Sequence, residues 1–93
     1  MPERFPLGEV HLTLLAFQTL LGNGGFGQLN TLLQRHRGGD FGDLCVDDRR
    51  VNEQQIRQGG RVLSSYPLPC GTVLWIVTEA GWRQTTVLVR EEY

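Results

Sequence analysis

Residues 72–79 read Thr-Val-Leu-Trp-Ile-Val-Thr-Glu, the most strongly β-forming stretch of the chain. Almost every residue in it is β-branched or aromatic, and such residues favour strands. Successive side chains of a strand point to opposite faces of the sheet. Val73, Trp75 and Val77 are therefore expected on one face, and Leu74, Ile76 and Thr78 on the other. This segment is therefore expected to be the central strand.

Two further strands are expected on either side of it along the chain, over residues 61–68 and 84–90. Residues 69–71 (Pro-Cys-Gly) suit a hairpin turn, because proline presets one dihedral angle and glycine accepts a positive φ. Residues 80–82 (Ala-Gly-Trp) turn the chain again. The C-terminal half thus predicts a three-stranded antiparallel meander.

The N-terminal half is predicted to be mainly helical. Residues 7–13 alternate weakly and indicate a short strand, which could add a fourth strand to the sheet. Thr13 is expected to cap a helix that places Leu14, Phe17 and Leu21 on its buried face, and a second helix is expected over residues 26–37.

Residues 46–58 indicate a third helix, which is poor in apolar residues and is expected on the surface with a narrow contact. The predicted order is β-α-α-α-β-β-β. It places all 93 residues in a single α+β domain, with helices packed on the sheet.

The composition excludes several classes of function. Hydrophobic residues make up 40% of the chain and charged residues 20%, with a net charge of −1, and this balance argues against a nucleic-acid partner. No apolar stretch is long enough for a membrane span or a signal sequence, so a cytoplasmic protein without membrane attachment is expected. Cys45 and Cys70 are expected to be reduced and partly buried. Together with His11 and His36 they are too scattered for a zinc site, so no metal or cofactor is expected.

Several segments carry a family resemblance. They are His-Arg-Gly-Gly-Asp-Phe-Gly-Asp-Leu at 36–44, Gly-Gly-Arg-Val-Leu-Ser-Ser-Tyr at 59–66, Leu-Trp-Ile-Val-Thr-Glu-Ala at 74–80, Thr-Thr-Val-Leu at 85–88 and Glu-Glu-Tyr at 91–93. The chain resembles a family of short, uncharacterised bacterial proteins, plasmid-related and found on mobile elements. That family shows the pattern His-x-x-Gly-Asp-Trp/Phe-Gly-Asp followed by Trp-Ile-x-Thr-Glu-Ala. The resemblance implies an accessory role in mobile genetic elements and no particular activity.

Some members of that family are labelled subunit M of a type I restriction system. An adenine methyltransferase needs an Asn/Asp-Pro-Pro-aromatic motif, and the prolines here stand singly. The chain also departs from the family at Phe41, where a tryptophan is usual, and at Gly81-Trp82, where Asp-Arg is usual. Cys45 stands where the family often has a capping residue or another cysteine. The sequence therefore does not support methyl transfer.

His36, Asp40 and Asp43 form the most suggestive polar set. A histidine and two carboxylates this close in sequence could bind a divalent metal and support a small hydrolase or nuclease. They could equally be structural, because aspartates in turns bond backbone amides and a histidine in a last helical turn can bond free carbonyls. On the structural reading, Phe41 anchors the loop in the core.

The function expected from the sequence is a non-enzymatic module that binds other proteins, and the alternative is the metal-dependent hydrolase just described. No catalytic or metal-binding residue is assigned. The candidate interaction residues are His36, Asp40, Phe41, Asp43, Arg61, Tyr66, Trp75, Glu79 and Trp82.

The predicted interface is the sheet face that the helices leave uncovered. Its apolar residues are expected among Val62, Leu63, Tyr66, Val87, Leu88 and Val89, and a homodimer or a partner protein is expected to cover them. In the competing arrangement, the N-terminal segment with Phe5 and Leu7 folds across this face and completes a monomer.

Overall fold

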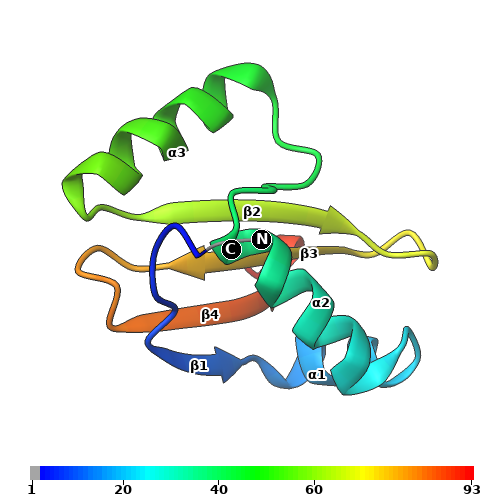
Figure 1. Cartoon of the computed structure of the whole chain (residues 1–93). Coiled ribbons are helices and arrows are strands. Elements are labelled where there is room, and N and C mark those ends of the chain that lie inside the picture. The colour runs from blue at the N-terminus through cyan, green and yellow to red at the C-terminus, as the bar shows by residue number, and fades with distance from the viewer. Residues whose placement is uncertain (1–2) are drawn as a thin grey trace.

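The computed structural model describes residues 3–93 and shows an α+β domain built on one sheet (Figure 1). The elements are β1 (Glu9–Leu12), α1 (Leu14–Leu21), α2 (Gly25–Arg37), α3 (Val46–Gln58), β2 (Val62–Pro67), β3 (Val73–Thr78), β4 (Gln84–Val89) and a short 3₁₀ turn, η1 (Arg90–Glu92). The predicted class and order are confirmed. Only η1 was not expected.

The four strands lie in the order β1-β4-β3-β2. β2, β3 and β4 form the expected antiparallel meander, with Trp75 opposite Ser65 on one side and Leu88 on the other. β1 adds to the far side of β4 and runs parallel to it. The first and last strands of the chain are therefore neighbours, and β1 and β2 form the two outer edges.

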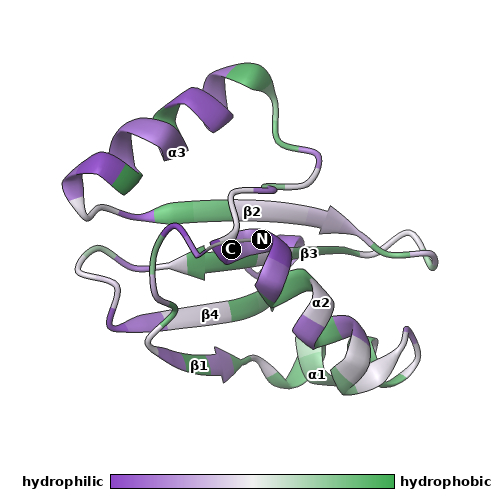
Figure 2. Ribbon diagram, viewed as in Figure 1, coloured by the Kyte–Doolittle hydropathy of each residue, from purple (hydrophilic) through white to green (hydrophobic). Residues whose placement is uncertain are grey.

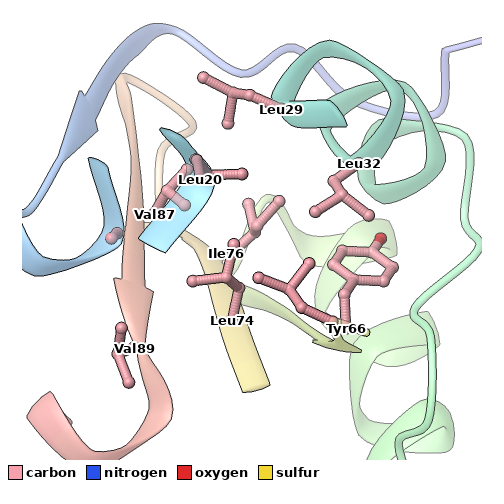
Figure 3. Close-up of a cluster of buried hydrophobic side chains, with 10 residues drawn as sticks. Leu20, Leu29, Leu32, Tyr66, Leu74, Ile76, Val87 and Val89 are labelled. Atoms are coloured by element: carbon pink, nitrogen blue, oxygen red, sulfur yellow. The ribbon is translucent and has the colours of Figure 1, made fainter. Parts of the chain in front are cut away.

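Helices α1 and α2 cover one face of the sheet, and their contact with it forms the main core (Figure 3). The helices contribute Ala16, Leu20, Leu29 and Leu32, and the strands contribute Tyr66, Leu74, Ile76, Val87 and Val89. Val62, Tyr66, Val87 and Val89 were expected on the uncovered face. That assignment is wrong, because the strand register turns all four toward the helices and buries them.

A second cluster fills the rest of the same side, where the N-terminal segment crosses the sheet (Figure 1). Phe5 and Leu7 are buried there with Phe41, as the anchoring role of Phe41 requires. The competing arrangement, in which Phe5 and Leu7 fold across the face that the helices leave uncovered, is therefore wrong. Gly42, with φ of 74°, lies so close to the Ser65 carbonyl that a Cβ would clash with it, so this loop position requires glycine.

The opposite face is covered by its own side chains and the C-terminal turn. The Trp75 ring contacts the Tyr93 ring with centroids 5.0 Å apart, and the Arg61 guanidinium lies over the Tyr93 ring, 5.0 Å from its centroid. Val73, Val77 and Leu88 are buried on this face. The open apolar face expected from the sequence is thus much narrower, because η1 brings Tyr93 back over β3.

Helix α3 lies along the outer edge of β2 and is almost entirely hydrophilic (Figure 2). Val46 and Val51 are exposed, which confirms the expected surface position. Its one buried residue is Asn52, whose Nδ2 donates to the Leu63 carbonyl at 2.6 Å while Oδ1 accepts from the Leu63 amide at 3.1 Å. The side-chain amide therefore pairs with the β2 edge as a neighbouring strand would.

No helix within residues 3–93 combines the length and the apolar character that crossing a bilayer requires. Cys45 and Cys70 are free thiols and both are exposed, which corrects the expectation that they are partly buried.

Candidate functional site

His36 lies at the centre of a buried chain of hydrogen bonds. Its Nδ1 is 2.5 Å from Ser64 Oγ, and its Nε2 is 2.9 Å from Thr78 Oγ1. Thr78 Oγ1 is in turn 2.7 Å from Thr85 Oγ1, which donates to the Leu7 carbonyl at 2.6 Å. The chain thus joins α2, all three strands of the meander and the N-terminal segment.

The last hydrogen bond of this network, from Thr85 to Leu7, determines which group donates in each of the others. Thr85 gives its hydroxyl proton to Leu7, so Thr78 donates to Thr85, and His36 Nε2–H donates to Thr78. Ser64 then donates to the free lone pair of Nδ1. Both nitrogens are satisfied in the neutral ring, and burial lowers the pKa of His36 to about 3.

This Ser–His pair has no access to a substrate, because His36 and Ser64 both have exposed fractions of 0%. Its partners are strand hydroxyls instead of a carboxylate that would stabilise an imidazolium. The arrangement is therefore structural. It also corrects the expectation that His36 bonds the free carbonyls at its helix end.

Neither aspartate is a hydrogen-bond partner of His36, whose two nitrogens pair with Ser64 and Thr78. The carboxylate of Asp40 pairs with Arg35, at 2.8 Å from Nε, and accepts from the Gly42 amide at 3.2 Å. The Arg35 hydrogen bond is the main reason that the pKa of Asp40 is lowered. Asp43 is exposed, and in residues 3–93 its carboxylate accepts no hydrogen bond.

His36, Asp40 and Asp43 therefore do not converge. In the described part of the chain, no three His, Cys, Asp or Glu side chains are grouped so that they could hold a metal ion. The structural reading of Asp40 agrees with its bond to Gly42. The same reading is wrong for Asp43, which uses only its backbone amide, in a bond to the Ser65 carbonyl.

The remaining sequence candidates are dispersed and do not form one site. Tyr66 is buried, where its hydroxyl donates to the Asp40 carbonyl and burial raises its pKa. Trp82 donates from Nε1 to the Gly60 carbonyl and contacts Phe5. Glu79 is exposed beside this turn, whereas Arg61 and Trp75 lie on the opposite face of the sheet.

The largest departure from the sequence expectation is an apolar surface on α1. Leu14, Phe17 and Leu21 were expected to be buried, yet their exposed fractions are 72%, 36% and 62%. The expectation is wrong because Ala16 and Leu20 face the core instead. Leu15 and Phe26 extend the exposed group, with 46% and 68%. We call these five residues, Leu14, Leu15, Phe17, Leu21 and Phe26, the α1 surface.

A shallow apolar groove lies within the α1 surface. It is lined by Leu12, Phe17, Leu20, Leu21, Gly25 and Phe26. Phe17 and Phe26 contact each other across the α1–α2 turn, with ring centroids 6.2 Å apart. No charged side chain occurs between Leu12 and Gln34, and the carboxylate of Glu92 lies at the start of α1, where it accepts from Thr13 Oγ1 at 2.7 Å.

The sequence carried a signal for this surface that periodicity alone missed. Five of the eight residues of α1 are large and apolar, and Gln18 and Thr19 are its only polar residues (Figure 2). A helix that is apolar on most sides is normally buried on most sides. In residues 3–93, only the side of α1 that carries Ala16 and Leu20 is buried.

Comparison of the chain with known protein families, curated proteins and solved structures finds no match.

Proposed function

We propose that the protein is a non-enzymatic interaction module whose docking site is the α1 surface. The observation that carries the proposal is the exposure of five large apolar side chains on and beside one helix. They expose on the order of 500 Å² of apolar area, which is in the upper range of the largest patch on a monomer. Exposing this area to water is unfavourable unless a partner covers it.

The partner that fits this surface is another protein presenting an apolar, uncharged helix. The groove beside Phe17 and Phe26 is apolar and shallow, so it favours a flat apolar contact, and no residue between Leu12 and Gln34 is charged. Binding is therefore driven by burial of apolar surface, and it should depend little on salt.

The biological setting rests on the family resemblance of the sequence. It supports an accessory protein of mobile genetic elements that acts in the cytoplasm. The two free, exposed cysteines are in keeping with a reducing compartment.

The test begins with a photo-crosslinking amino acid placed at Phe26, with the same amino acid at Gln54 as the control. Gln54 is exposed on α3, away from the α1 surface. In cells that express the protein, we expect a crosslinked partner from position 26 and none from position 54. Equal capture from both positions, or none from either, contradicts the proposal.

The captured partner is then purified and its affinity measured by calorimetry at low and high salt. A change of less than about threefold between 0.05 and 0.5 M salt is expected for an uncharged interface. A loss of affinity of about tenfold or more contradicts an apolar docking site and indicates an ionic one.

A further inference from the structure

β1 is the open edge of the sheet. In residues 3–93 it pairs only with β4, and it forms the lower border of the sheet in Figure 1. The other outer edge, β2, is occupied by Asn52 and by a bridge between Gly42 and Ser65. Unpaired backbone groups at a sheet edge are a template for a further strand.

The backbone of β1 determines which residues could pair outward. The amides of Glu9 and Thr13 donate inward, to the carbonyls of Arg83 and Val87 at 2.9 and 3.0 Å. Because this direction alternates along a strand, the N–H and C=O groups of Val10 and Leu12 point outward.

We propose that β1 pairs antiparallel with β1 of a second copy of the chain, about a two-fold axis at Val10. In a symmetric antiparallel pair, the central residue lies opposite itself. A centre at Val10 lets two outward-pointing backbones exchange both of their hydrogen bonds. It also joins the two sheets into one continuous eight-stranded sheet.

The side chains of β1 favour this register over its neighbours. A centre at Glu9 would place two carboxylates opposite each other, and a centre at His11 would pair two histidines. A centre at Val10 instead places each Glu9 opposite His11 of the second copy, with two valines between them. At both ends of the ladder a carboxylate thus faces an imidazole, which can donate a hydrogen bond to it.

In the single chain, the side chains of Glu9 and His11 lie close to each other and are exposed, so a second copy can contact them. Glu9 Oε1 lies 3.2 Å from His11 Nε2, and their side chains are 76% and 48% exposed. They occupy the same face of β1, since they are two residues apart. In the dimer the two pairs form one cluster of alternating carboxylates and imidazoles.

The dimer adds to the proposed function without depending on it. The dimer contact is centred on the backbone of Val10 and adjoins the α1 surface at Leu12, which lines the groove, and a two-fold dimer carries two α1 surfaces. A partner with two docking helices would then bind with a raised effective concentration. Loss of the β1 contact would leave each α1 surface intact.

The experiment is sedimentation equilibrium on the full chain from micromolar to millimolar concentration. We expect a reversible dimer that Glu9→Lys weakens at least about tenfold, because the carboxylate that accepts a hydrogen bond from His11 of the second copy is lost. The double variant Glu9→Lys, His11→Glu moves the carboxylate to position 11 and the donor to position 9, and it should restore the dimer. Asp47→Lys makes the same charge change on α3 and should leave the dimer unchanged.

A second variant tests the backbone pairing. Val10→Pro removes an outward N–H that β4 does not use, so the fold should persist, as circular dichroism would show, while the dimer is lost. A monomer at every concentration overturns the proposal. So does a dimer that withstands both Glu9→Lys and Val10→Pro but is lost with Leu21→Arg, because that dimer would use the α1 surface.

Discussion

At the scale of single residues, His36 shows how a chemically suggestive side chain is used for packing. Its two nitrogens bond hydroxyls on β2 and β3, which lie far from it in sequence. The sequence marks the histidine but not these partners, because the strand register that brings Ser64 and Thr78 to it is a tertiary feature. Ser64, Thr78 and Thr85 were therefore missed, and His36 was grouped with nearby aspartates instead.

The first prediction concerns the pH dependence of stability. The pKa of His36 is about 3 in the folded chain and 6.5 in the unfolded chain, so below pH 6.5 only the unfolded state gains this proton. Stability is then fully present above pH 6.5 and falls as the pH is lowered toward 3, by about 1.4 kcal/mol per pH unit. Urea denaturation at pH 7 and pH 5 should show a loss of about 2 kcal/mol.

This interval lies above the pH at which the lowered pKa values of Asp40 and Glu53 contribute. A His36→Gln variant supplies the control and should show a flatter profile between pH 7 and 5. If the wild-type protein is equally stable at both values, the neutral, buried state of His36 is wrong.

The second prediction separates the two aspartates of the loop. Asp40→Ala removes the Arg35 pair and the bond to Gly42, and it should lower the free energy of unfolding by about 1 kcal/mol, since the pair is partly solvent-exposed. Asp43→Ala removes only an exposed carboxylate and serves as the matched control, with no measurable change. Equal losses in chemical denaturation would show that Asp43 has a role in the fold.

At the scale of elements, the sequence predicts well which helices and strands the chain forms and in which order. Glycine and proline mark the ends of the elements, and α3 begins and ends where expected, at Val46 and Gln58. The buried face of α1 could not be predicted, because a helix with apolar residues on most sides has no single preferred face. Packing against the sheet determines which face is buried, and Ala16 and Leu20 are the residues of α1 that it buries.

The third prediction concerns the contact between α3 and the sheet. Asn52→Leu keeps the volume but leaves the Leu63 amide and carbonyl without partners, so it should cost about 2 kcal/mol. Gln54→Leu changes an exposed residue of the same helix and should cost under about 0.5 kcal/mol. If both variants denature at the wild-type midpoint, α3 is not held to the edge of β2 by this amide.

At the scale of the whole molecule, two long-range features lie beyond the reach of the sequence pattern. β1 joins β4 in parallel, and η1 folds Tyr93 back over Trp75. Neither leaves a local signature, since each depends on where the chain ends meet the finished meander. The Tyr93 contact narrows the face that was expected to bind a partner and leaves α1 as the main apolar surface.

The central claim is that the α1 surface is exposed for binding and is not needed for folding. Leu20 and Leu21 are neighbours on one helix, with exposed fractions of 3% and 62%, and they offer a matched pair of substitutions. Leu20→Ala opens a cavity in the core and should lower the free energy of unfolding by about 3 kcal/mol. Leu21→Arg should leave it within about 0.5 kcal/mol of the wild-type value.

The most direct test is the affinity of Leu21→Arg for the partner crosslinked at position 26, measured together with its stability. The account predicts wild-type stability and an affinity at least about tenfold lower, because a charge enters an apolar interface. Wild-type affinity in this variant, or unfolding of the chain, would contradict it.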